Sequence, residues 1–192
     1  MIAYWRERFD PMRFGPAAAL LAMAAAATGG GSLPDWGLTA VLALVFVKAL
    51  VALLLVMQFR IWDDLADRGR DRREHPERVL VTAKRGWPFV AQAVALAAVN
   101  LALVHQFEGR VAAAVLLAIN AAATAYYLLR GPHRSVGSDL LLLAKYPAFV
   151  VILSPADARP GRLVLAIATT YAAACAFEVW HDAAGPLRIN PS

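Results

Sequence analysis

An acidic cluster interspersed with arginines follows the second long apolar stretch of the chain. Six of the fourteen Asp and Glu residues fall between positions 63 and 77. Asp64, Asp67 and Asp71 are spaced i, i+3 and i+7, so a helix continuing past the apolar stretch would carry all three on one face. Like charges at this spacing destabilise a helix unless a cation lies between them. Because Mg²⁺ prefers one or two carboxylates, water and substrate phosphates, the spacing indicates a site for a metal-bound diphosphate.

A second acidic pair lies near the end of the last apolar stretch. Glu178 and Asp182 are four residues apart and would share one helix face. Glu178 falls in the last turn of that stretch, where an acid usually faces a polar cavity or a partner. Two carboxylate groups across one cavity would hold two Mg²⁺ ions that neutralise a leaving diphosphate as a C–O bond breaks. The alternative for both clusters is a solvated helix end whose acids pair with nearby arginines.

The composition indicates the kind of scaffold that holds these acids. The chain has 192 residues, of which 60% are hydrophobic and 17% charged, and its mean hydropathy is +0.54. These values are typical of an integral membrane protein and argue against a soluble α/β enzyme, a disordered chain and a disulfide scaffold. The net charge of +5 is carried between the apolar stretches. We therefore expect no nucleic-acid partner.

Six apolar stretches approach the length of about 20 residues that a helix needs to cross a bilayer. Their residues show no alternation of apolar and polar positions, and only helices or closed barrels satisfy the backbone in lipid. The sequence thus predicts an all-α membrane bundle of six transmembrane helices in a single domain, residues 1–192, with a polar loop at 60–86. The expected spans are 14–33, 38–59, 87–105, 110–129, 139–154 and 162–180.

The distribution of positive charge predicts the orientation. Of nineteen Lys and Arg residues, three lie in the expected outside loops (Arg110, Arg159 and Arg162) and two lie within spans (Lys48 and Lys145). The remainder lie in segments that are cytoplasmic if both termini are cytoplasmic, as the positive-inside rule requires. We therefore expect a protein of a bacterial-type inner membrane with both termini in the cytoplasm. Both acidic clusters then lie on the same side of the membrane.

These motifs, in this order between the spans, resemble those of the UbiA superfamily of intramembrane prenyltransferases. The family's first signature, N-D-x-x-D-x-x-x-D, is similar to residues 63–71, with Asp63 in place of the asparagine. Its R-P-L segment resembles residues 78–80, with Val79 in place of the proline. Its Y-x-x-x-K/R ending resembles residues 126–130, and Glu178 with Asp182 keeps the spacing of its D-x-x-x-D motif. Family members usually have about nine spans, so this chain resembles a short member.

The resemblance implies both a fold and a reaction. It implies a UbiA-like bundle that moves an isoprenyl group from an isoprenyl diphosphate to a lipophilic or aromatic acceptor, with Mg²⁺ as cofactor. The implied metal ligands are Asp63, Asp64, Asp67, Asp71, Glu178 and Asp182, of which Asp64, Asp67 and Asp182 are the catalytic candidates. The implied substrate-binding residues are Arg130, Arg134, Lys145, Arg60, Arg78, Tyr126 and Tyr127.

Two other functions stay open. A non-catalytic UbiA-like subunit would bind a lipid, quinone or pigment, or would scaffold a larger complex. A partner subunit, a second copy or membrane lipid would then replace the missing spans. A small transporter is the third interpretation, built on Lys48 and Asn100, but the chain lacks paired broken helices or a repeat.

Three polar residues within the spans need partners. Lys48 lies near the middle of its span, about 24 Å along a helix from Asp64, and a buried ammonium requires a partner or water. Asn100 and Asn120 fall on adjacent spans, where amides commonly join helices by hydrogen bonds.

Overall fold

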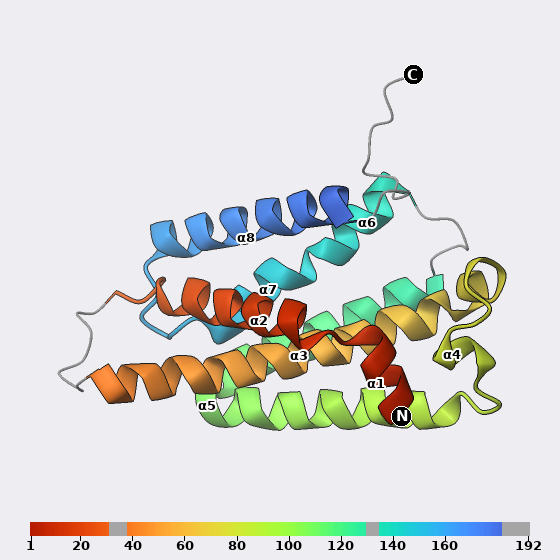
Figure 1. Cartoon of the computed structure of the whole chain (residues 1–192). Helices are drawn as coiled ribbons and strands as arrows, with labels where there is room; N and C mark the ends of the chain where they lie inside the picture. The colour runs from red at the N-terminus through yellow and green to blue at the C-terminus, as the bar shows by residue number, and fades with distance from the viewer. Residues whose placement is uncertain (31–37, 130–134, 182–192) are drawn as a thin grey trace, which may run out of the picture.

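The computed structural model describes residues 1–30, 38–129 and 135–181, and these residues form a helical bundle (Figure 1). The only extended pairing among them is an isolated bridge between Gly29 and Ala158. The predicted all-α class is therefore confirmed. The helices of the described ranges are α1 (Ile2–Arg8), α2 (Pro11–Ala26), α3 (Leu38–Glu74), α4 (Val79–Thr82), α5 (Trp87–Leu129), α6 (Val136–Leu143), α7 (Lys145–Leu153) and α8 (Pro160–His181).

Four helical segments of the described ranges are long and apolar enough to cross a membrane, as expected for an integral membrane protein. They are Val41–Glu74, Trp87–Leu129, Val136–Leu153 and Pro160–Trp180. The first predicted stretch, 14–33, forms α2, which begins earlier at Pro11 and ends at Ala26. The prediction of six spans rests on counting α2 as a span and α5 as two.

Helix α5 is a hairpin of two legs that reverse at Gly109. This glycine has φ 88° and ψ −178°, a backbone conformation that side chains with a Cβ rarely adopt. Gln58 of α3 hydrogen-bonds both Asn100 on the first leg and Asn120 on the second, so the two legs lie side by side. The turn falls between the predicted stretches 87–105 and 110–129.

Helix α3 extends well beyond its predicted end at residue 59. It continues without interruption to Glu74, so much of the segment expected as the loop 60–86 is helix. Ion pairs one turn apart support this extension: Arg60 with Asp64 at 3.6 Å and Arg70 with Glu74 at 3.3 Å. The extension carries the acidic motif away from the apolar part of the bundle as a continuous helix.

The predicted stretch 139–154 forms two short helices that meet at Ala144. Ser135 caps the first helix, α6, by accepting a hydrogen bond from the Ser138 backbone. Lys145 begins the second, α7, and Pro147 lies in its first turn, where a missing backbone N–H leaves no hydrogen bond unmade. The break therefore places Lys145 at the start of a helix.

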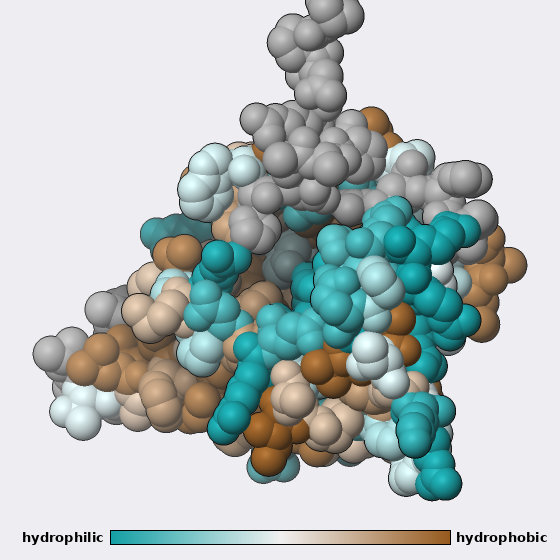
Figure 2. Space-filling model, turned by 45° about the vertical axis from the view of Figure 1, so that its right-hand side comes forward, coloured by the Kyte–Doolittle hydropathy of each residue, from teal (hydrophilic) through white to brown (hydrophobic). Residues whose placement is uncertain are grey.

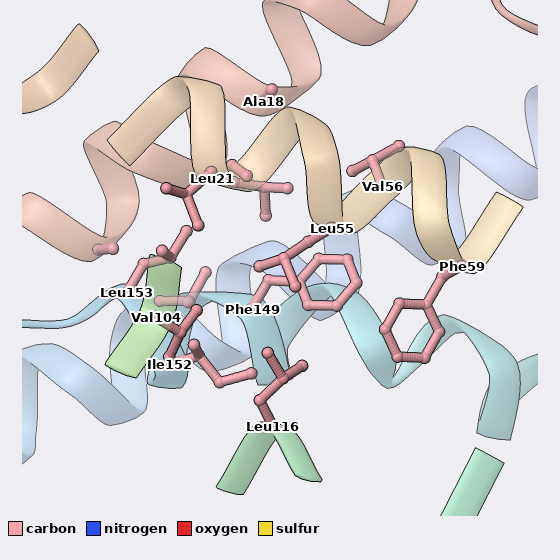
Figure 3. Close-up of a cluster of buried hydrophobic side chains, with 14 of the residues drawn as sticks. Ala18, Leu21, Leu55, Val56, Phe59, Val104, Leu116, Phe149, Ile152 and Leu153 are labelled. Atoms are coloured by element: carbon pink, nitrogen blue, oxygen red, sulfur yellow. The ribbon is translucent and has the colours of Figure 1, made fainter. Parts of the chain in front are cut away.

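The apolar core lies where α2, α3, α5 and α7 meet (Figure 3). Leu55 and Phe59 of α3 pack with Leu116 of α5 and with Phe149 of α7, and all four are buried. Lipid is as apolar as these side chains, so close packing and polar contacts hold such a bundle together. Helix α2 contributes small residues such as Ala18, which let its backbone approach closely.

A ladder of amide side chains crosses this core. Gln58 donates to Asn120 Oδ1 at 2.7 Å, and Asn100 donates to Gln58 Oε1 at 2.8 Å and to the Leu54 carbonyl at 3.0 Å. The expected link between Asn100 and Asn120 thus runs through Gln58. All three amides are buried, and their hydrogen bonds hold α3 against both legs of α5.

Replacing Gln58 by leucine is expected to lower the free energy of unfolding by about 1 kcal/mol, the usual size of such bonds between membrane helices. The loss is measured by denaturant titration in detergent micelles. Met57→Leu, at the neighbouring half-buried position, is the control and leaves stability unchanged. A Gln58→Leu protein as stable as the wild type would show that the ladder does not hold the helices together.

Candidate functional site

The first acidic motif lies at one end of the bundle, where the extension of α3 meets α1 and α4. Figure 2 turns this end toward the viewer and shows hydrophilic residues gathered there, with hydrophobic residues over much of the remaining surface in view. The acids divide between two sets of partners, which come from different helices.

Asp64 is buried and is held by helix α1. Arg8 donates from Nε to Oδ2 at 2.9 Å and from Nη2 to Oδ1 at 2.5 Å. This bidentate contact fixes the orientation of the Asp64 carboxylate. Tyr4 donates its hydroxyl to Oδ2 at 2.9 Å. Burial first, and then the charge of Asp64, raises the pKa of Tyr4, so its phenol stays protonated and remains a donor. Both carboxylate oxygens of Asp64 thus bind side chains of the N-terminal helix, and Arg60 of α3 lies 3.6 Å from Oδ2.

Asp71 is also buried and pairs with Arg78, whose Nη1 lies 2.6 Å from Oδ1. Arg78 is the N-cap of α4, so this pair fastens the short helix to the end of α3. Glu7 of α1 reaches the same place by accepting a hydrogen bond from the Val79 amide at 2.9 Å. Asp64 and Asp71 therefore join α1, α3 and α4 into one unit.

Asp63 faces the opposite group of helices. Its carboxylate accepts hydrogen bonds from the Tyr127 hydroxyl, at the end of α5, and from the Lys145 ammonium, at the start of α7. The Tyr126 ring lies against that of Tyr127, with centroids 5.8 Å apart. The structure thus brings together Asp63, Tyr127 and Lys145, three residues predicted for one site from separate parts of the chain.

Asp67 lies one turn after Asp63 on α3. It forms an ion pair with Arg70 at 3.2 Å and remains half-buried. Because Asp63 and Asp67 are four residues apart, they share one face of the helix. Asp67 is also four residues from Asp71, so on the helix surface it lies between the contacts of Asp63 with α5 and α7 and the anchoring contacts of Asp71.

The described ranges contain no group of three His, Cys, Asp or Glu side chains placed to hold a metal ion. Mg²⁺ seldom needs such a group, because one or two carboxylates with water and substrate phosphates suffice. Asp63 and Asp67 supply that number of carboxylates, and Lys145 and Tyr127 supply donors for phosphate oxygens. The donor set fits Mg²⁺ that arrives with a diphosphate better than a preformed metal centre.

The second acidic motif is described only in part. Glu178 is a half-buried residue of α8, and this helix packs against α7, α2 and α6. Asp182, Arg130 and Arg134 lie outside the described residues. The predicted meeting of the two acidic motifs across one cavity therefore stays a prediction.

A buried ion pair lies near the other end of the bundle. Lys48 Nζ lies 2.5 Å from Glu108 Oε1 and donates to the Leu153 carbonyl at 2.6 Å. Their side chains are only 6% and 8% exposed. Lys48 thus joins α3 to the turn of α5 and to the end of α7, which supplies the partner that its burial requires.

Sequence reasoning identified Lys48 and the acids but missed their partners. Arg8 and Tyr4 were not recognised as partners of Asp64, nor Glu108 as the partner of Lys48. Gln58 was also missed, although a glutamine inside an apolar stretch is a usable signal for a contact between helices. The other partners lie 56 to 60 residues away in sequence, where no local spacing reveals them.

Comparisons with family models, curated proteins and solved structures gave no match to this chain. The fold and the described site thus define a helical protein of the membrane class, with a cluster of charged and phenolic side chains at one end.

Proposed function

We propose that this chain is a short UbiA-like prenyltransferase of a bacterial-type inner membrane, with six spans and both termini in the cytoplasm. It would bind an isoprenyl diphosphate at its polar end and transfer the prenyl group to a lipophilic or aromatic acceptor. The observation that carries this proposal is the convergence of Tyr127 and Lys145 on Asp63, from three separate helices. An ammonium, a phenol and a carboxylate beside an apolar bundle suit a ligand with a diphosphate head and a hydrocarbon tail.

In the proposed chemistry, Asp63 exchanges its contacts with Lys145 and Tyr127 for a contact with Mg²⁺. Lys145 forms an ion pair with Asp63. Asp63 and Asp67 would hold Mg²⁺ that arrives with a diphosphate, and Lys145 and Tyr127 would donate to the phosphate oxygens. Mg²⁺ supplies neutralisation of the charge that develops on the leaving diphosphate. Asp64 and Asp71 hold α3 in place through Arg8 and Arg78, and so act as positioning residues.

The Tyr146 ring adjoins this cluster, with its centroid 5.5 Å from Lys145 Nζ, and further aromatic side chains follow it in the core. Phe59 lies 5.7 Å from Trp62 and 5.3 Å from Phe149, and Tyr146 lies 6.1 Å from Phe149, all between ring centroids. Trp62 and Tyr146 are half-buried and adjoin Asp63 and Lys145 in sequence. Aromatic faces attract cations, so such a group would stabilise the allylic cation formed as the C–O bond breaks.

The test is binding of farnesyl diphosphate to the purified protein in detergent, with Mg²⁺ or with EDTA. We expect binding that requires Mg²⁺ and that weakens at least about tenfold, or 1.4 kcal/mol, in Asp63→Asn and in Lys145→Met. Arg73→Met removes an exposed cation at the same end of the bundle and is the matched control, with unchanged affinity. Equal affinity in EDTA, or in Asp63→Asn, would contradict the proposal.

A non-catalytic membrane subunit is the second candidate, and two observations favour it. The two most buried acids of the motif, Asp64 and Asp71, are engaged by arginines of the same chain and serve as anchors. Helix α8 also carries an apolar window in which no residue is fully buried, a surface that lipid or a partner would cover. Folded protein that binds no farnesyl diphosphate under any condition would favour this function.

A further inference from the structure

Three cations at the junction of α3 and α5 have no carboxylate partner among the described residues. Arg68 donates from Nη2 to the Ala83 carbonyl at 2.9 Å, while its buried Nε has no hydrogen-bond partner. Lys84 and Arg85 follow Ala83 directly and are exposed. The neighbouring Arg70, by contrast, pairs with acids. A half-buried guanidinium with an unmade hydrogen bond is costly unless an anion joins it.

The backbone of this junction is shaped around the Arg68 guanidinium. A Cβ added to Gly86 would lie 2.6 Å from Arg68 Nη1, so the glycine allows the side chain to lie directly against the chain. Arg68 therefore cannot swing far without losing both this contact and its bond to Ala83. Lys84 and Arg85 lie between Ala83 and Gly86, the two residues that contact Arg68.

An apolar stripe begins immediately after these cations. Trp87, Val90 and Val94 are 65%, 51% and 59% exposed and are spaced i, i+3 and i+7, so one outward face of α5 carries all three. In a membrane protein such a face contacts acyl chains, and an exposed tryptophan at its end marks the headgroup level. A phospholipid whose chains follow this stripe has its phosphate beside Lys84 and Arg85.

We propose that this junction is a binding site for one anionic phospholipid, with its phosphate on Arg68, Lys84 and Arg85 and its chains along Trp87 and Val94. Two features favour an anionic phospholipid. The cations complement its phosphate, and the apolar face of α5 that follows them directly suits its acyl chains. Juxtamembrane clusters of Lys and Arg attract anionic headgroups in the same way. The site shares no residue with the Asp63 cluster, so it stands apart from the proposed prenyl transfer.

The test compares lipids on the full-length protein in detergent, by native mass spectrometry and by thermal melting. Wild-type protein is expected to retain phosphatidylglycerol at least about tenfold more tightly than phosphatidylcholine. A variant carrying Arg68→Gln, Lys84→Gln and Arg85→Gln is expected to lose this preference while melting normally in phosphatidylcholine. A variant carrying Arg72→Gln and Arg73→Gln removes exposed charge from the end of α3, and it is expected to keep the preference.

Two further experiments identify the bound molecule. Gly86→Ala displaces Arg68 without removing any charge, so it is expected to weaken the preference for phosphatidylglycerol. Glycerol 3-phosphate, which carries the phosphate without acyl chains, is expected to give no thermal protection. Equal protection by glycerol 3-phosphate would identify a soluble phosphate as the ligand and overturn the lipid assignment. Equal retention of the two lipids, or retained preference in the triple variant, would overturn the site itself.

Discussion

Replacing Lys48 by methionine is expected to lower the free energy of unfolding by about 3–5 kcal/mol, the usual cost of removing one member of a buried ion pair. The ammonium lies 2.5 Å from the Glu108 carboxylate and 2.6 Å from the Leu153 carbonyl, in a place almost without solvent. Methionine has a similar volume but no charge and no donor. Glu108 would then stay buried without its counter-ion, and α3, the turn of α5 and the end of α7 would lose their common contact.

The loss of stability in Lys48→Met is expected to depend strongly on its partner, Glu108. Glu108→Leu alone is expected to be destabilising, whereas Lys48→Met combined with Glu108→Leu is expected to lie within about 1 kcal/mol of the wild type, because no charge is left unpaired. Lys84→Met, at an exposed lysine, is the control. Denaturant titration in micelles measures all four proteins. If the double variant is as unstable as Lys48→Met, the loss comes from packing and the ion pair is not its cause.

The second large effect is expected at Asp64. Changing it to alanine is expected to cost about 3 kcal/mol, the low end for a buried pair, because Arg8 is partly exposed and can reach water. The change removes the acceptor of both Arg8 and the buried Tyr4 hydroxyl, which are the main polar contacts of α1. Helix α1 is therefore expected to detach before the rest of the bundle unfolds.

Limited proteolysis distinguishes the detachment of α1 from unfolding of the whole bundle. Cleavage near Arg8 is expected to become faster in Asp64→Ala while the rest of the chain stays resistant. Glu74→Ala removes a more exposed acid of the same helix, one that pairs with Arg70, and is expected to change stability by less than about 1 kcal/mol. An Asp64→Ala protein whose N-terminus is as resistant as that of the wild type would refute the anchoring role.

Apolar runs and turn residues were enough to place most of the helical segments. The break between the third and fourth stretches falls at Gly109, where the backbone requires a glycine, and the last stretch coincides closely with α8. Hydropathy alone could not predict that α3 continues to Glu74. That extension depends on ion pairs along the helix and on contacts with α1 and α4, which an apolar count ignores.

The sequence predicted which residues belong to the candidate site, but not which of their side chains contact one another. Helical spacing suggested one shared face for Asp64, Asp67 and Asp71, whereas the packing sends Asp64 to α1 and Asp71 to α4. Asp63, which the resemblance gives as one of six implied metal ligands, is the acid that meets Lys145. Such outcomes depend on which helix packs against which side of α3, and this is set by contacts between residues far apart in the chain.

The docking of α1 also fixes an order of events during biosynthesis. Arg8 leaves the ribosome 56 residues before its partner Asp64. At about 5–20 residues per second, α1 waits roughly 3–11 s for that partner, and longer for Val79. During this interval the aromatic and basic segment lacks its partner, and α2 must form without it. Helix α1 thus precedes its partners in synthesis, and its docking waits until α3 and the start of α4 have been made.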